Sequence, residues 1–211
     1  MADTIEYKDI KQMITMAAKN IRLHCDELSK MDAATGDGDH GTTIVRAMDI
    51  AEKIIREGQD KDLKPLLKDV GWGVMGVDGG ATGPLLGSFL MGLSTGMGDQ
   101  KIIDPKTMAQ MFKAGLAGVQ KRSKAKVGDK TLMDTLIPAV ETLSKAVEDN
   151  ASIKDSLEAA AKAAQKGARS TKEFKARFGR AKNLGDRTLG CQDPGATSMA
   201  LIFQGFFEAM V

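Results

Sequence analysis

Apolar residues recur three and four positions apart along most of this 211-residue chain, the spacing that lines one face of an α-helix. The clearest run extends from Tyr7 to Ser29. Clean alternation of apolar and polar residues, which marks half-buried strands, is hard to find, and aromatic residues make up only 4% of the chain. We therefore predict an all-α protein.

Signals for helix starts support this prediction. Asp104 offers an N-cap acceptor, and Pro105 stands at the first helical position, where a missing N–H costs nothing, so a helix is expected from there to about Arg122. Apolar spacing and alanine content predict further helices over residues 42–57, 62–76, 84–95, 131–149, 152–170 and 196–209. About eight helices result. Because no change of composition or linker divides them, we expect one domain over residues 1–211.

Charge and cysteine content narrow the classes of partner. The chain carries 30 basic and 28 acidic residues without a long basic run, so neither nucleic acid nor an anionic membrane is expected as a main partner. Cys25 and Cys191 lack paired spacing, which fits a reducing compartment. The N-terminus has acids where a signal peptide needs a basic start, and no run of eighteen apolar residues follows. We expect a soluble, cytoplasmic protein.

Glycines gather at the junctions between the predicted helices. Four clusters occupy Gly36–Gly41, Gly79–Gly83, Gly128–Thr131 and Gly190–Gly195. In an up-and-down array of helices, alternate junctions lie at the same end. Several of these loops are therefore expected to converge, and that end is where we expect the chemistry.

Three acids form the sharpest chemical pattern. Asp32, Asp37 and Asp39 fall within eight residues with no Lys or Arg between them. Two unit charges 4 Å apart repel by roughly 4 kcal/mol at an effective dielectric of 20, so a cation is expected nearby, and all-oxygen ligands favour Mg²⁺. An EF-hand is excluded because the twelfth residue from Asp37 is Met48 instead of a glutamate. The alternative is a solvated turn in which one acid caps the next helix.

Other residues point to a phosphate group. The N–H groups of the Gly79–Gly83 loop and the dipole of the helix that follows favour an anion, although glycines also serve turns and close packing. His40 abuts two of the acids and can donate to a phosphate, while Arg180 is either a phosphate clamp or part of a solvated loop. Two literal G-x-G-x-x-G matches follow no predicted strand and no Walker A sequence occurs, which excludes Rossmann and P-loop sites.

Four motifs in order carry a resemblance to a known family. Asp32-x4-Gly-Asp37-x-Asp39-His40-Gly41, the Gly79–Pro84 loop, Gly128-Asp129-Lys130-Thr131 and Gly190–Ser198 resemble the L subunit of bacterial dihydroxyacetone kinase over nearly the whole chain. The resemblance implies an antiparallel barrel of eight helices with ADP or ATP at one end, and two Mg²⁺ ions held by Asp32, Asp37 and Asp39. It further implies that the nucleotide contacts His40, Gly41, Thr42, Thr43, Ala81, Thr82, Ser123, Leu132, Arg180, Asp193, Pro194 and Gly195.

The same resemblance implies a function and its partners. The chain would transfer a phosphoryl group from Mg-bound nucleotide to dihydroxyacetone on a separate K subunit, and a phosphohistidine donor protein of the phosphotransferase system would recharge the ADP. Three alternatives remain: an ATP-dependent ketose kinase, a fatty acid kinase domain, which the end at Val211 disfavours, and a non-catalytic Mg-nucleotide adaptor for a transcription regulator. A homodimer stays open. Thr43, Ser123 and Lys182–Asn183 depart from the familiar residues, which leaves the contacts to base and ribose open.

Overall fold

The computed structural model describes residues 3–58 and 62–211, and this part of the chain is built from helices. Its α-helices are α1 (Tyr7–Leu23), α2 (Cys25–Ala33), α3 (His40–Glu57), α4 (Leu63–Met75), α5 (Thr82–Gly96), α6 (Pro105–Gln120), α7 (Met133–Glu148), α8 (Ile153–Ser170) and α9 (Pro194–Glu208). Two 3₁₀ segments, η1 (Thr171–Glu173) and η2 (Arg180–Thr188), precede α9. Within the described ranges the only β-pairing is an isolated bridge between Ile5 and Ile103, so the prediction of an all-α protein is confirmed.

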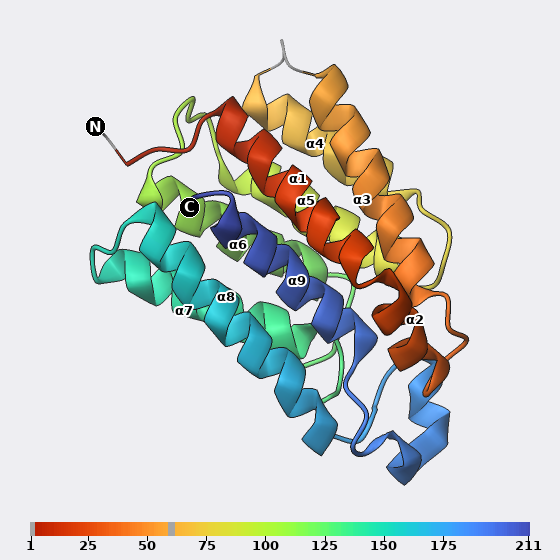
Figure 1. Cartoon of the computed structure of the whole chain (residues 1–211). Coiled ribbons are helices and arrows are strands. Elements are labelled where there is room, and N and C mark those ends of the chain that lie inside the picture. Colours follow the sequence, from red (N-terminus) through yellow and green to blue (C-terminus); the bar gives the residue numbers. More distant parts are fainter. Residues whose placement is uncertain (1–2, 59–61) are drawn as a thin grey trace.

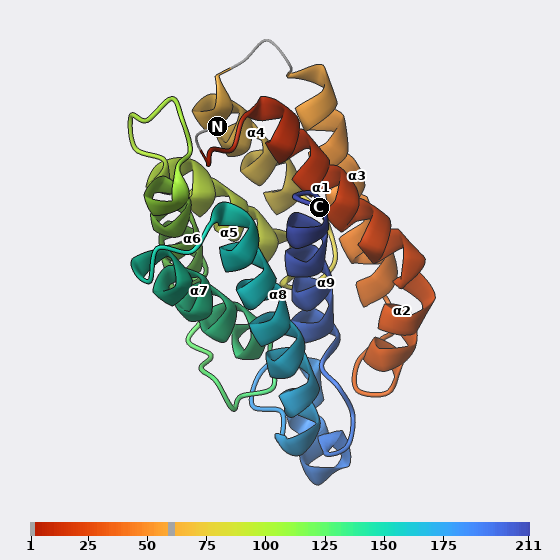
Figure 2. The same ribbon diagram turned by 60° about the vertical axis from the view of Figure 1, so that its left-hand side comes forward.

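Eight of these helices form a closed ring. Packing contacts run in the order α1, α3, α4, α5, α6, α7, α8 and α9, and α9 returns to α1. Neighbours in the ring run in opposite directions, as in an up-and-down bundle (Figure 1). The short helix α2 continues beyond the end of α1, on the side of the molecule away from both chain termini (Figure 2). The expected barrel of about eight helices is therefore observed.

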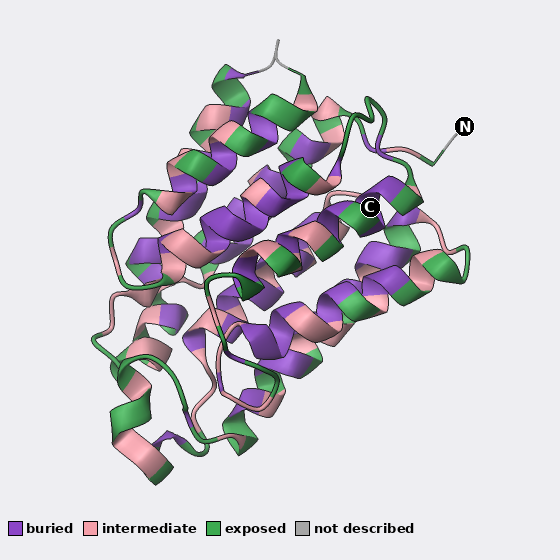
Figure 3. Ribbon diagram, turned by 180° about the vertical axis from the view of Figure 1, so that it is seen from behind, coloured by how far each residue is buried: buried purple, intermediate pink, exposed green. Residues whose placement is uncertain are grey.

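The inner sides of the ring helices carry the hydrophobic core. Buried residues follow the faces that the helices turn toward one another, and exposed residues follow the outer faces (Figure 3). Four rings from α5, α6 and α9 meet in the centre with centroids 5.7–6.3 Å apart: Phe89, Phe112, Phe203 and Phe206. Methionines such as Met13, Met48 and Met108 are buried in the same core, where flexible side chains fill irregular gaps.

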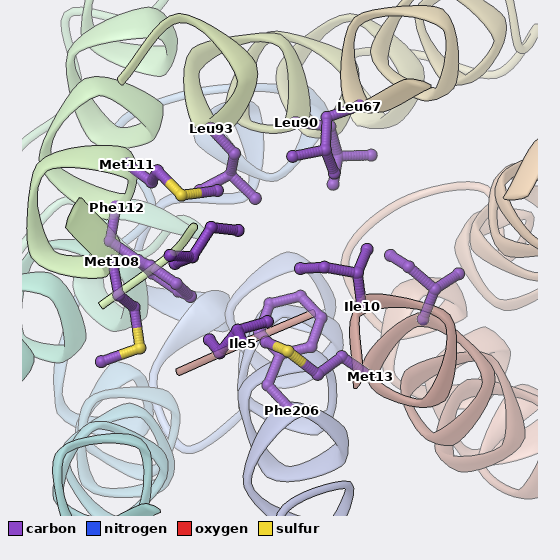
Figure 4. Close-up of a pocket in the computed structure, with 12 residues that line it drawn as sticks. Ile5, Ile10, Met13, Leu67, Leu90, Leu93, Met108, Met111, Phe112 and Phe206 are labelled. Carbon is purple, nitrogen blue, oxygen red and sulfur yellow. The ribbon is translucent and has the colours of Figure 1, made fainter. Parts of the chain in front are cut away.

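A small apolar cavity lies within this core near the N-terminal bridge. It has a volume of about 20 Å³, and all the side chains that line it are hydrophobic. Figure 4 shows Ile5, Met13, Met108 and Phe206 around it, from the N-terminal segment, α1, α6 and α9. A buried water needs two to four polar partners, which this lining does not supply, so the cavity is a packing defect of the core.

Two features differ from the sequence-based prediction. The expected helix from Tyr7 to Ser29 is interrupted at His24, whose backbone leaves the helical region at φ −108° and ψ 12°. The ring nitrogen Nδ1 of His24 bonds the carbonyl oxygen of Asn20 at 2.8 Å, and this side-chain donor competes with the main-chain hydrogen bonds that would continue the helix. The two 3₁₀ segments were not predicted, because η1 has only three residues and η2 is interrupted by Gly185 at φ 58°.

The other predicted helices are present with boundaries shifted by up to two residues. The helix predicted from residue 196 begins at Pro194, where the side chain of Asp193 accepts the N–H of Ala196 at 2.7 Å. The helix predicted from residue 42 begins at His40. None of the described helices combines the length and the apolar character needed to span a membrane.

Candidate functional site

Three carboxylates converge where α2 gives way to α3. Asp32 lies in the last turn of α2, and Asp37 and Asp39 follow in the connecting loop, which turns at Gly38 with φ 81°. One carboxylate oxygen from each acid can be chosen so that all three lie within 4.8 Å of one another. A hydrogen bond orients the carboxylate of Asp32, because its Oδ2 accepts the N–H of His40 at 3.2 Å. The acids that the sequence singled out therefore share one site.

The charge of this cluster is only partly balanced. The guanidinium group of Arg180, at the start of η2, forms an ion pair with Asp37. The carboxylate of Asp39 makes no hydrogen bond or ion pair within residues 3–58 and 62–211. Three acids with one guanidinium leave room for further positive charge, and donors that are all oxygen suit Mg²⁺. The residues present thus fit the divalent ions expected from the sequence.

His40 connects three helices beside the acids. Its Nε2 lies 3.0 Å from Oγ of Ser198 on α9, and its Nδ1 lies 3.2 Å from Oγ1 of Thr82 on α5. Both hydroxyl groups lie within hydrogen-bond distance of the imidazole, and the hydroxyl of Ser198 also donates to the carbonyl oxygen of Gly195 at 3.1 Å. Burial lowers the pKa of His40, opposed by the negative charges of the neighbouring acids. A neutral ring at this position joins the starts of α3, α5 and α9.

The glycine-rich loop before α5 has an open side and a packed side. Gly79 and Gly80 have φ values of 129° and 58°, which side chains rarely adopt. A Cβ on Gly79 would lie 2.5 Å from Oγ1 of Thr43, and one on Gly83 would lie 2.6 Å from the carbonyl of Val77, whereas Gly80 meets no atom within 4 Å. Close packing therefore explains Gly79 and Gly83, whereas the open side at Gly80 leaves space for a ligand.

An arginine pins this loop to α3. The guanidinium group of Arg46 donates to the carbonyl of Asp78 at 2.9 Å and to Oγ1 of Thr43 at 3.1 Å. Ala81 caps α5 without a side-chain hydrogen bond, so the first N–H groups of that helix keep no side-chain acceptor at the cap. Free N–H groups at a helix start favour an anion.

These elements surround a cavity of about 680 Å³. This volume falls within the range of roughly 300–1,000 Å³ that is typical of small-molecule sites. The residues that the sequence predicted and that line it are Asp32, Asp37, Asp39, His40, Ala81, Thr82, Ser123, Leu132, Arg180, Asp193, Pro194 and Gly195. Its remaining wall includes an apolar part made by Ile44, Leu85, Leu86, Met199 and Ile202.

Three predicted residues in the first turn of α3 are not among the residues that line the cavity. Gly41 is buried, and a Cβ there would overlap the carbonyl oxygen of Cys25 on α2. Thr42 is exposed and its hydroxyl donates to the carbonyl of Asp39 at 2.9 Å. Thr43 is buried under Gly79. These residues shape the turn that presents His40.

Other lining residues were not predicted as ligand contacts. Ser198 closes the fourth sequence motif, and its contact with His40 spans 158 positions of the chain. Phe178 belongs to the same loop as Arg180, and Lys130 belongs to the third motif. The motifs contained Ser198 and Lys130, but nothing in their local spacing showed that they meet the other loops.

Burial also alters an acid on the far wall. Desolvation raises the pKa of Asp193 to about 7, partly opposed by the N–H of Ala196, which its carboxylate accepts, and by the positive charge of Lys130. A cavity with one acidic rim, one glycine loop and one apolar wall can hold a ligand with an anionic end and an apolar body.

The profile of the family described as "DAK2 domain" matches residues 34–208 of the chain. The chain belongs to this family. Its sequence is 38% identical over 177 residues to the ADP-binding subunit DhaL of a PEP-dependent dihydroxyacetone kinase from Escherichia coli (strain K12), which covers 84% of each chain. It is 36% identical over 183 residues to the ADP-binding subunit DhaL of a PTS-dependent dihydroxyacetone kinase from Lactococcus lactis, which covers 87% of each chain.

The fold of this DAK2 domain is also found in a solved kinase. The dihydroxyacetone kinase of C. freundii in complex with AMP-PNP and Mg²⁺ superimposes with a TM-score of 0.71 at 25% sequence identity. The match covers 99% of the present chain and 35% of the C. freundii chain, so the DAK2 domain spans about a third of that kinase. The resemblance predicted from the four sequence motifs is therefore confirmed.

Proposed function

We propose that this chain is the ADP-binding subunit of a dihydroxyacetone kinase. It would transfer a phosphoryl group from its Mg-bound nucleotide to dihydroxyacetone held on a separate K subunit. The single observation that carries the proposal is the meeting of Asp32, Asp37 and Asp39 at the rim of a cavity of about 680 Å³. The names of the E. coli and L. lactis relatives supply the nucleotide and the reaction, and the C. freundii complex supplies AMP-PNP with Mg²⁺.

The chain's own residues divide the work of holding the nucleotide. Asp32, Asp37 and Asp39 would hold two Mg²⁺ ions, and bound Mg²⁺ neutralises charge on phosphate oxygens during phosphoryl transfer. Gly80, Ala81 and Thr82 line the same cavity, and the N–H groups at a helix start such as that of α5 favour phosphates. Arg180, which pairs with Asp37 in this structure, brings a positive charge to the cavity mouth. Phosphoryl transfer depends on such positioning and charge balance more than on a protein nucleophile.

Two protein partners belong to the proposal. A K subunit would present dihydroxyacetone, and a phosphohistidine donor protein of the phosphotransferase system would recharge ADP in place, in the cytoplasm and within one domain over residues 1–211. The L. lactis relative is named as PTS-dependent, which supports this donor. A homodimer and a contact with a transcription regulator stay predictions.

A second candidate is an ATP-dependent ketose kinase subunit. It is favoured by the similarity to the C. freundii kinase, whose complex contains AMP-PNP, and by 35% identity to an L-erythrulose kinase from Pectobacterium atrosepticum, of which the present chain covers 32%. In this case ATP would enter and leave the cavity in each reaction cycle. In the first case ADP stays bound between cycles.

Reconstitution separates these candidates. The purified chain is combined with a K subunit and dihydroxyacetone, and product is measured with either ADP and the phosphohistidine donor or ATP alone. Dihydroxyacetone phosphate formed only with the donor supports the first proposal, and product formed with ATP alone supports the second. If neither mixture yields product while Mg-nucleotide binds, the non-catalytic adaptor replaces both. Mass spectrometry of the nucleotide that co-purifies gives an independent answer.

A further inference from the structure

Lys130 is a buried cation with no role in the proposed chemistry. The residue is 3% exposed, yet it lines the cavity beside Thr131 and Leu132. Its ammonium group donates to the carbonyl oxygen of Thr171 at 2.6 Å and to that of Cys191. Burying an ammonium group is costly unless its charge and its donors are satisfied, so a lysine here demands an explanation.

The loop that carries Lys130 is built to aim it inward. The carboxylate of Asp134, in the first turn of α7, accepts the N–H of Gly128 at 2.5 Å and that of Thr131 at 2.7 Å. Between these two anchors the backbone takes the left-handed conformation at Lys130, with φ 59°. A non-glycine residue holds this conformation only where its surroundings enforce it.

The two acceptors of Lys130 lie beside the residues Asp193, Pro194 and Gly195, which line the cavity. Thr171 lies in η1, and its hydroxyl oxygen accepts the N–H of Asp193 at 2.9 Å. Cys191 stands two residues before Asp193, whose carboxylate caps α9. One turn into α9, Ser198 meets His40 at 3.0 Å. A continuous path of hydrogen bonds thus runs from Lys130 through the start of α9 to the acidic end of the cavity.

The walls on either side of this path face each other closely. A Cβ placed on Gly195 would lie 3.8 Å from the Cβ of Leu132, so the starts of α7 and α9 are near neighbours. Charge holds the same elements together, since Asp193 and Asp134 both act on Lys130 electrostatically. Loss of the ammonium group would free the segment Cys191–Gly195 to move relative to α7.

We propose that Lys130 is a positioning residue for nucleotide binding, whose ammonium group holds the segment Cys191–Gly195 in place so that the start of α9 forms the cavity wall. The proposal rests on the proposed function in one respect, namely that the ligand is a Mg-bound adenine nucleotide. Lys130 would act through Thr171, Cys191 and Asp193 and would not touch the nucleotide.

The test compares Lys130→Met with Lys126→Met in the full-length chain. Methionine keeps the length of the side chain and removes its charge, and Lys126 is an exposed lysine of the same loop that does not line the cavity. Calorimetry measures the affinity for Mg·ADP well below the melting temperature, and circular dichroism first checks that each variant is folded at that temperature. Loss of a residue that supports metal ligands from behind typically costs about 10–100-fold in affinity. We expect a loss of this order for Lys130→Met, while Lys126→Met binds like the wild type.

A purely structural lysine gives a different result. In that case Lys130→Met lowers the melting temperature but the folded protein binds Mg·ADP within twofold of the wild type, and the proposal is wrong. If the wild type itself does not bind Mg·ADP, the proposed function fails first, and the role of Lys130 fails with it.

A milder variant covers the event that Lys130→Met does not fold. Thr171→Val keeps the side-chain shape and removes the hydroxyl group, which accepts the N–H of Asp193 and donates to the carbonyl oxygen of Ala168 within its own turn. We expect several-fold weaker binding of Mg·ADP and faster amide hydrogen exchange in residues 191–196, with no change in α1. Unchanged affinity together with unchanged exchange in that segment would overturn the relay from Lys130 to α9.

Discussion

Replacing Asp39 by asparagine should change stability and binding in opposite directions. The substitution removes one negative charge from a cluster in which ligand atoms of Asp32, Asp37 and Asp39 lie within 4.8 Å of one another. Arg180 pairs with Asp37. Asp39 itself has no ion-pair partner among the described residues. Without metal, Asp39→Asn should therefore stabilise the fold, and with metal it should weaken the binding of Mg-nucleotide.

The geometry gives both magnitudes. At 4.8 Å in water, each of the two pairs that Asp39 forms repels by about 0.9 kcal/mol. Screening, together with the favourable interaction of Asp39 with the start of α3 that it caps, worth about 0.3–1 kcal/mol, reduces the net gain to about 0.5 kcal/mol. A protein of this size then gains about 1–2 °C in melting temperature. A carboxylate about 2 Å from a divalent ion contributes about 4 kcal/mol at the same dielectric, and because the asparagine oxygen stays a neutral ligand, we expect a loss of about 100-fold in affinity.

Two assays test the predicted gain in stability and the predicted loss of affinity. Thermal melts in a chelator report the metal-free stability, and calorimetry with Mg·ADP reports the affinity. Asp26→Asn is the matched control, since Asp26 is an exposed acid in the first turn of α2 and lies outside the cavity. There the loss of a favourable helix-dipole interaction should lower stability by about 0.3–1 kcal/mol and leave affinity unchanged. The assignment of the metal site is refuted if Asp39→Asn binds Mg·ADP as tightly as the wild type.

Three further predictions concern the scaffold. Asp104→Ala should cost about 0.5–2 kcal/mol in urea melts at pH 7, because its carboxylate caps α6. The N–H of Thr107, which the carboxylate accepts, holds the pKa of Asp104 below its ordinary value. The stability that the cap contributes is therefore present above the ordinary pKa and is lost as the pH falls through the lowered pKa. An equal cost of Asp104→Ala at pH 7 and pH 2 would contradict this. Gly41→Ala should destabilise the fold by about 1–3 kcal/mol, because the added Cβ would overlap α2. In the control Gly76→Ala the added Cβ would meet no atom nearer than 3.7 Å, so thermal stability should change little. Equal effects of the two substitutions would contradict the overlap. Phe203→Ala, in the aromatic centre, should cost about 3–5 kcal/mol by the same melts, and a cost under 1 kcal/mol would be inconsistent with its complete burial.

Local sequence patterns were sufficient for most of the helices. Caps that act within three residues, at Asp104, Ser152 and Asp193, make in the structure the side-chain hydrogen bonds that their residue types favour. The periodic spacing of apolar residues depends only on neighbours along one helix, so it can be recognised in the sequence without any knowledge of tertiary contacts. The break at His24 escaped prediction because a side chain that bonds its own helix leaves the apolar pattern intact.

Contacts between distant loops could not be derived in the same way. The three acids were predicted because they lie within eight residues, and their repulsion is a local fact. By contrast, Lys130 finds its acceptors 41 and 61 positions away, and His40 finds Ser198 158 positions away. Such pairs arise only when the ring closes and brings the loops to one end, a property of the whole fold.

Neighbouring helices of the ring run in opposite directions, and this explains why the site forms at one end of the barrel. Four helices begin here, and residues at the starts of α3, α5, α7 and α9 line the cavity: His40, Thr82, Leu132, Pro194 and Gly195. The ends of α4 and α8 contribute nothing to the lining, and beyond the end of α6 the chain supplies Arg122 and Lys124. The cavity therefore receives the positive ends of four helix dipoles but few negative ends, and its field favours an anion. The acids of the α2–α3 loop work against that field, and a divalent ion resolves the conflict because it binds the carboxylates and the anion together.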